Sequence, residues 1–178
     1  MNWNIKTWLF ASILACSPSI IFAQKNAKST VIDDIITIDL PAYNLKNIDN
    51  TLLTKADLNS EWPTMIVMFN PTCDHCEDFG KDLVKHSAQF QQINIVFVAA
   101  PPLHDYLADF ASQIAYNQWK GTNLKLTVDT DGSLLQQLFD YVTLPEIKIY
   151  DKKGAFLYSK NALDNISNIS DWMSTHLK

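Results

Sequence analysis

The sequence predicts an α/β domain in which a central mixed sheet is flanked by helices on both faces. Two continuous apolar runs, at 63–70 and 93–100, are each followed by a stretch in which apolar residues recur at helical spacing. A strand–turn–strand pattern at 146–160 then precedes a last amphipathic stretch. Strands that alternate with helices in this way predict a layered domain built on one sheet.

The part of the chain before the first apolar run predicts extra strands in front of this core. Residues 29–47 mix strand-forming residues with turn formers, which indicates one or two short strands. Residues 47–62 indicate a turn, a further strand, and a short helix or loop. These elements precede the alternating part, so we expect them as additions at its N-terminal side.

The middle of the chain predicts two buried strands, each followed by a helix. The run 63–70 is bounded by Pro63 and Asn70, and its continuous apolar character is typical of a central strand. Helical spacing follows through residues 79–90. The run 93–100 is the second buried strand, and 103–114 is an amphipathic helix.

The last third of the chain predicts a strand, a short helix, a hairpin and a terminal helix. Residues 124–132 read as a short strand and turn, and 133–142 as a short helix with Ser133 as its N-cap. Residues 146–160 alternate on either side of a turn, which predicts the hairpin. Residues 166–177 place apolar side chains on one helical face.

Residues 1–23 have the pattern of a secretory signal peptide. Lys6 is followed by an apolar stretch that ends at the small residue Ala23. We therefore expect export, with residues 24–178 as the mature domain. Two alternatives remain open: a transmembrane anchor, although the apolar part is short for a span of roughly 20 residues, and a lipoprotein anchored through Cys16.

Charge and cysteine content narrow the class of protein. The formal net charge is −5 and lysines and arginines do not cluster, so nucleic acid is excluded as a partner. Removal of residues 1–23 leaves only Cys73 and Cys76. A small secreted scaffold would carry four or more cysteines. We expect a monomer with a single close cysteine pair.

The stretch Cys73-Asp74-His75-Cys76 has the spacing of a redox pair. Cys73 follows a predicted buried strand, so it should lie at the N-terminus of the next helix. The positive end of the helix dipole stabilises a thiolate there, and a protonated His75 would act in the same direction. Cys73 can then attack a disulfide in a partner, and Cys76 can resolve the mixed disulfide.

Other interpretations of the pair are weaker. Structural zinc needs four ligands, often two such pairs, and the chain has no second one. A static disulfide that closes so small a loop would constrain the unfolded chain little. We therefore expect neither a metal nor another cofactor.

Two segments together carry a resemblance to a known family. "MIVMFNPTCDHC" and "FDYVTLPEIKIYDKKG", in which Pro145 directly precedes an alternating strand, resemble the thioredoxin superfamily. The exported TlpA/ResA-like thiol-disulfide oxidoreductases are the most similar branch. The resemblance covers roughly residues 35–178 and implies a thioredoxin-like fold and a bacterial, periplasmic protein.

The resemblance also implies roles for individual residues. It places Pro145 as a cis-proline that faces the cysteines, and it leaves the backbone of Leu144 exposed for pairing with an extended substrate. Thr143 and Thr72 are the further substrate-binding positions that it implies. From the local sequence alone, a trans proline opening an edge strand would be the first expectation.

The sequence also departs from the superfamily pattern. Thr72 stands where many thioredoxins have a tryptophan before the first cysteine, and Val67 stands where thioredoxins bury an aspartate. Phe79 occupies the position of a glutamate common in TlpA-like reductases. A usual buried proton acceptor is thus missing, and His75 is the candidate for that role because its ordinary pKa is near neutrality.

The predicted function is that of an exported enzyme that exchanges electrons with protein thiols and disulfides through Cys73 and Cys76. The direction of transfer stays open, and a periplasmic reductase would need a membrane electron donor. Two alternatives are a thioredoxin-fold copper chaperone, because thiolates favour Cu(I), and an interaction domain with a vestigial cysteine pair.

Overall fold

The computed structural model describes residues 29–32, 35–139, 143–161 and 166–177. The predicted signal peptide 1–23, its cleavage near Ala23 and the alternative anchor at Cys16 all lie outside the described residues. Within the described ranges, no helix is both long enough and apolar enough to cross a membrane.

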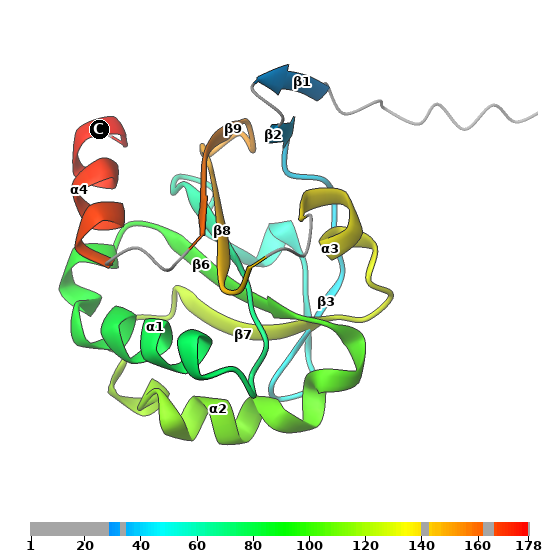
Figure 1. Ribbon diagram of the computed structural model, residues 1–178, viewed down its shortest axis with the longest axis vertical. Helices are drawn as coiled ribbons and strands as arrows, with labels where there is room; N and C mark the ends of the chain where they lie inside the picture. Colours follow the sequence, from blue (N-terminus) through cyan, green and yellow to red (C-terminus); the bar gives the residue numbers. More distant parts are fainter. Residues whose placement is uncertain (1–28, 33–34, 140–142, 162–165, 178) are drawn as a thin grey trace, which may run out of the picture.

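A seven-stranded mixed sheet forms the centre of the domain, in the order β4-β3-β7-β6-β5-β8-β9 (Figure 1). Strands β5, β6 and β7 are parallel, whereas β8 is antiparallel to β5 and β3 is antiparallel to β7. The strands predicted at 63–70, 93–100, 124–132 and 146–160 therefore lie in one sheet, as expected. The strand bounds are β3 Leu45–Asn47, β4 Leu52–Leu53, β5 Thr64–Met68, β6 Asn94–Ala99, β7 Leu124–Asp129, β8 Glu146–Tyr150 and β9 Phe156–Asn161.

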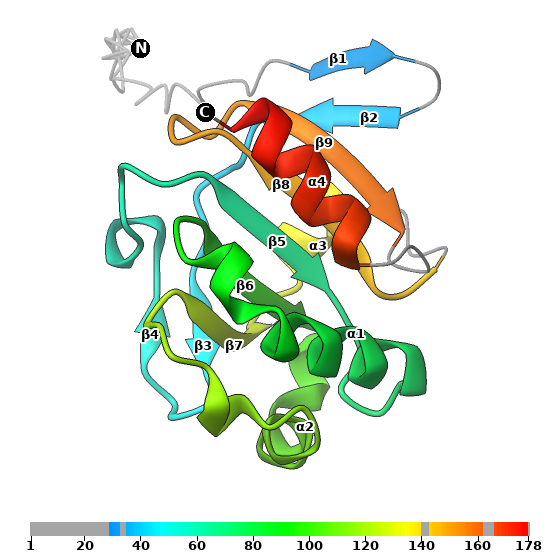
Figure 2. The same cartoon turned by 90° about the vertical axis from the view of Figure 1, so that its left-hand side faces the viewer.

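Helices cover both faces of this sheet, which confirms the predicted class (Figures 1 and 2). Helices α1 (Asp74–Lys85), α2 (Leu107–Gln113) and α4 (Ile166–His176) pack their apolar residues into one core. Helix α3 (Ser133–Leu138) packs into a second core on the opposite face. Short 3-10 turns lie at Lys55–Asp57, Ser87–Phe90, Pro101–Tyr106 and Tyr116–Gln118.

The extra N-terminal strands are present in two places. Strands β1 (Ser29–Ile32) and β2 (Ile35–Ile38) form an antiparallel hairpin outside the main sheet (Figure 2). The chain then passes the β8–β9 turn, where the Leu40 N–H donates to the Gly154 carbonyl at 2.8 Å. It continues to β3 and β4, which form the far edge of the sheet.

Aromatic rings fill the core between the sheet and α1 and α2. The ring centroids of Phe69 and Phe97 lie 5.2 Å apart, and those of Phe69 and Phe110 lie 4.7 Å apart. Helix α1 approaches the end of α2 closely, because a Cβ at Gly80 would lie only 2.6 Å from Cγ2 of Ile114. This packing fixes α1, and with it the cysteine pair, against the sheet.

Two helices differ from the prediction at their N-termini. The predicted helix 103–114 begins as a 3-10 turn at Pro101 and becomes α-helical only at Leu107. The two prolines there lack N–H donors and fix the backbone, so the α-helical ladder starts later. Ser133 was predicted as an N-cap, but it is the first helical residue of α3, and Gly132 is the cap with φ of 73°.

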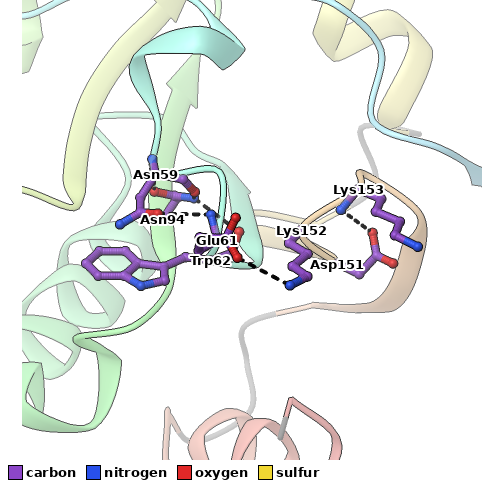
Figure 3. A network of polar contacts seen from close by, with 7 residues as sticks. All are labelled: Asn59, Glu61, Trp62, Asn94, Asp151, Lys152 and Lys153. Atoms are coloured by element: carbon purple, nitrogen blue, oxygen red, sulfur yellow. Dashed lines mark hydrogen bonds and ion pairs between the residues drawn. The ribbon is translucent and has the colours of Figure 1, made fainter.

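Polar contacts close the end of the sheet that lies away from the cysteines (Figure 3). The buried Asn94 side chain accepts from the Asn59 N–H at 3.0 Å and donates to the Asn59 carbonyl at 2.9 Å. Glu61, in the same loop, pairs with Lys152 of the β8–β9 turn at 3.4 Å. These contacts anchor the loop that enters β5. The cysteines lie at the opposite end of this strand, where β5 leads into α1.

Two tyrosine hydroxyls allow a matched test of the buried polar groups. The Tyr150 hydroxyl is buried without a hydrogen-bond partner among the described residues, whereas the Tyr116 hydroxyl donates to the Leu124 carbonyl at 2.9 Å. We expect Tyr150→Phe to raise the free energy of unfolding by about 1 kcal/mol and Tyr116→Phe to lower it by about 1 kcal/mol. Urea denaturation measures both. An equal loss of stability in the two variants would contradict this expectation.

Candidate active site

A short turn between β5 and α1 brings the first cysteine to the edge of the sheet. After Phe69 the chain turns at Asn70, and the Cys73 N–H donates to the Asn70 carbonyl at 3.1 Å. The Asn70 side-chain oxygen accepts from both the backbone N–H and the hydroxyl of Thr72, each at 2.9 Å. Asn70 therefore orders the backbone turn that leads from β5 to Cys73.

Cys73 is the N-cap residue of α1 and is partly exposed. Its carbonyl accepts from the N–H groups of Cys76 and Glu77, both at 3.0 Å, so the helix begins at this residue. The N-terminus of a helix carries roughly half a positive charge. Cys73 therefore lies at the N-terminus of this helix, where the sequence predicts it.

Cys76 lies one helical turn further on and is fully buried. Its sulfur accepts a hydrogen bond from the Asn70 N–H at 3.5 Å. Burial raises the pKa of the Cys76 thiol from 9.0 to about 12, and the Asn70 N–H opposes part of that rise. Both cysteines are free thiols, and they differ in access to solvent, since Cys73 is partly exposed and Cys76 is buried.

The Leu144–Pro145 peptide bond is cis, which confirms the prediction for Pro145. Pro145 is buried and directly precedes β8. Strand β8 runs antiparallel to β5 with Met68 opposite Glu146, so the start of β8 and the end of β5 share one edge of the sheet. Cys73 and Pro145 thus lie at the same edge, and a direct contact between them stays a prediction.

The surface beside the N-terminus of α1 is hollowed and acidic. A hollow of about 240 Å³ is lined by the carboxylates of Asp74, Glu77 and Asp109 and by the ring of Tyr106, among others. A larger open hollow of about 1120 Å³ lies around the C-terminal end of α1, at the opposite end from the cysteines. Volume alone therefore does not mark the reactive end of this helix.

Comparison with solved structures settles the fold. A secreted disulfide oxidoreductase of Mycobacterium tuberculosis, homologous to E. coli DsbE, superposes with a TM-score of 0.57 at 17% identity over 75% of this chain and 95% of its own. StoA from Bacillus subtilis gives 0.57 at 14% identity over 75% and 97%. A thioredoxin-like protein from Aeropyrum pernix gives 0.58 at 13% identity over 75% and 89%.

This chain has a thioredoxin-like fold. The predicted fold class is confirmed, including the extra N-terminal strands. No protein-family model matches the sequence. No curated protein matches it either.

The thioredoxin-like fold gathers the predicted site residues around one edge of the sheet. Thr72 and His75 are exposed on either side of Cys73 along the chain, and Thr143 and Leu144 are half-buried just before Pro145. Leu144 packs against both cores. The roles predicted for these residues remain predictions.

The departures from the superfamily pattern are visible inside this fold. Val67 and Phe79, which stand at the positions of the usual acidic residues, are both buried in the core on the α1 face. Over the described ranges, no three histidine, cysteine or acidic side chains come together as metal ligands.

Three residues of the site region were missed by sequence reasoning. Asn70 orders the turn before Cys73, and its position between a strand and a proline was the only signal. Glu146 and Lys148 lie on β8 and are buried, although an alternating strand ordinarily turns its polar side chains to solvent. Their burial follows from packing of distant residues on this face of β8, such as the rings of Phe139 and Phe156 beside Lys148, which no local pattern reveals.

Proposed function

We propose that this protein is an exported thiol-disulfide oxidoreductase that exchanges electrons with protein thiols and disulfides through Cys73 and Cys76. The observation that carries the proposal is the asymmetry of the pair. Cys73 caps a helix at an accessible edge, whereas Cys76 is buried with a raised pKa. An attacking thiol and a resolving thiol need this difference.

The reaction proceeds by two thiol-disulfide exchanges. The Cys73 thiolate attacks one sulfur of a partner disulfide, which forms a Cys73–partner bond and releases the other partner sulfur as a thiolate that takes up a proton. Cys76 then loses its proton and attacks the Cys73 sulfur, which forms the Cys73–Cys76 disulfide and releases the second partner thiol. The dithiol is oxidised by two electrons and the partner disulfide is reduced by two, and the reverse sequence oxidises a partner dithiol.

The surrounding residues have defined roles in this proposal. The backbone of Leu144, with Thr143 and Thr72 nearby, pairs with an extended partner segment, and Pro145 supports it next to the cysteines. His75 is exposed at the second position of α1 and exchanges the proton of the Cys76 step with solvent. Residues 1–23 direct the chain out of the cytoplasm.

Equilibration with glutathione tests the couple directly. We expect Cys73 and Cys76 to convert together into one intramolecular disulfide across a series of reduced-to-oxidised glutathione ratios, with a single midpoint. Each sample is quenched with acid and its free thiols are alkylated. Peptide mass then gives the fraction of Cys73 and Cys76 that is in the disulfide form. The midpoint potential also decides the direction of electron transfer. A value well above the cytosolic glutathione poise indicates an oxidant or isomerase, and one well below it indicates a reductase; 30 mV corresponds to about 1.4 kcal/mol for a two-electron couple.

A matched control is the His75→Pro variant, which alters the spacer and leaves both cysteines in place. We expect its midpoint to lie at lower potential, because loss of the imidazole removes a stabiliser of the thiolate. For the wild type, a separate glutathione adduct on each cysteine, with no Cys73–Cys76 disulfide at any glutathione ratio, would contradict the proposed function.

A further inference from the structure

A buried ion pair on β8 lies next to the proposed substrate edge. The side chains of Glu146 and Lys148 are only 11% and 6% exposed, and Lys148 Nζ lies 3.5 Å from Glu146 Oε1. Both project to the face of the sheet that α3 covers, opposite the core that holds Cys76. Charged side chains are rarely buried so fully unless they are paired.

Lys148 makes further contacts with elements on both sides of its strand. Its Nζ lies 5.5 Å from the ring centroid of Phe139, which follows α3, and 5.8 Å from that of Phe156 on β9. It also donates to the Ser159 hydroxyl at 3.4 Å. A cation over an aromatic face is attracted by the ring, and the attraction increases when water is excluded.

Two of these contacts lie at the ends of elements that border the proposed substrate edge. Glu146 directly follows Thr143, Leu144 and Pro145, and Phe139 is the residue that follows α3. Lys148 therefore contacts the first residue of β8, next to Pro145, and the residue at the end of α3. A backbone that must align with an extended peptide depends on the position of the strand that continues it.

We propose that Lys148 is a positioning residue, which holds the edge formed by Thr143, Leu144 and Pro145 in place for protein substrates through its contacts with Phe139 and Glu146. The inference rests on the proposed function. It predicts that recognition of a peptide depends on Lys148, whereas attack of Cys73 on a small disulfide does not.

The alternative is that Lys148 only stabilises the fold. The two roles can be separated because the stability of a buried ion pair responds differently to the loss of one charge and of both. Removal of one partner leaves an uncompensated charge and destabilises a protein, whereas replacement of both charges is often neutral or stabilising. Lys148→Met is therefore compared with the double variant Glu146→Gln/Lys148→Met. Lys148→Arg is the conservative variant that keeps the charge.

The test uses two disulfides with the same leaving group. One is a short extended peptide whose single cysteine is joined to thionitrobenzoate, and the other is 5,5′-dithiobis(2-nitrobenzoate), which has no peptide. The reduced full-length protein, with Cys16 replaced by serine in every variant, reacts with each under single-turnover conditions. Absorbance follows the released thionitrobenzoate. Urea denaturation gives the stability of every variant.

For the double variant we expect near-wild-type stability, a half-saturating peptide concentration raised about tenfold, and an unchanged limiting rate. The small disulfide should react at the wild-type rate, and Lys148→Arg should recover most of the peptide affinity. A double variant that binds the peptide as the wild type does overturns the inference. A wild-type protein that reacts with neither disulfide overturns the proposed function, and the inference with it.

Discussion

The Cys76→Ala variant should accumulate a covalent adduct with a peptide disulfide, whereas Cys73→Ala should form almost none. In the first variant the accessible thiol at the helix N-cap attacks normally. The mixed disulfide then lacks its resolving thiol and should persist for minutes to hours, the time scale of uncatalysed exchange. The wild type should resolve the same adduct within a single turnover.

The second variant tests the same geometry from the other side. With Cys73 replaced, the remaining thiol of the pair is fully buried, so adduct formation should fall by at least about a hundredfold. The peptide joined to thionitrobenzoate serves as substrate, and intact mass with peptide mapping identifies the cysteine that carries the adduct. A Cys76 adduct in Cys73→Ala that forms as fast as the Cys73 adduct in Cys76→Ala would exclude the assigned order of attack.

The parts of the fold that could be predicted are those in which one local pattern has one physical solution. Continuous apolar runs at 63–70 and 93–100 require burial on both faces, and both became central strands. A cysteine directly after such a strand must lie near the start of the next helix, and Cys73 is the N-cap of α1. The cis bond at Pro145 is different, since the local sequence favours a trans bond and only the family resemblance predicts cis.

The parts that could not be predicted depend on neighbours distant in sequence. The alternation in Glu146–Tyr150 indicates one face toward solvent, yet all five residues are buried because β8 lies between two strands and α3 covers its polar face. Lys148 therefore reads as a surface lysine in the sequence and is a buried cation in the structure. The order of strands in the sheet decides this, and that order is set by contacts across the whole chain.

Alkylation of Cys76 should be slow and should lack the pH midpoint of an ordinary thiol. Burial is the largest cause that raises the pKa of Cys76 from 9.0 to about 12, and the smaller contribution of Cys73 to this rise is lost in Cys73→Ala. The thiolate is the reactive form, so at any pH below the ordinary value the reactive fraction is smaller by up to about a thousandfold. The rate should keep rising about tenfold per pH unit beyond the point at which a free cysteine reaches its plateau.

The measurement is the rate of iodoacetamide labelling of folded Cys73→Ala between pH 7 and pH 11, read by peptide mass so that Cys16 is counted separately. The same protein in urea is the matched control, because unfolding removes the burial and should return the midpoint to the range of a free cysteine, about 8.5. Cys76→Ala supplies the opposite comparison, in which the partly exposed Cys73 should label far faster at neutral pH. A plateau near the ordinary pKa in folded Cys73→Ala would show that Cys76 is accessible, and the division of the pair into an attacking and a resolving thiol would then lose its physical basis.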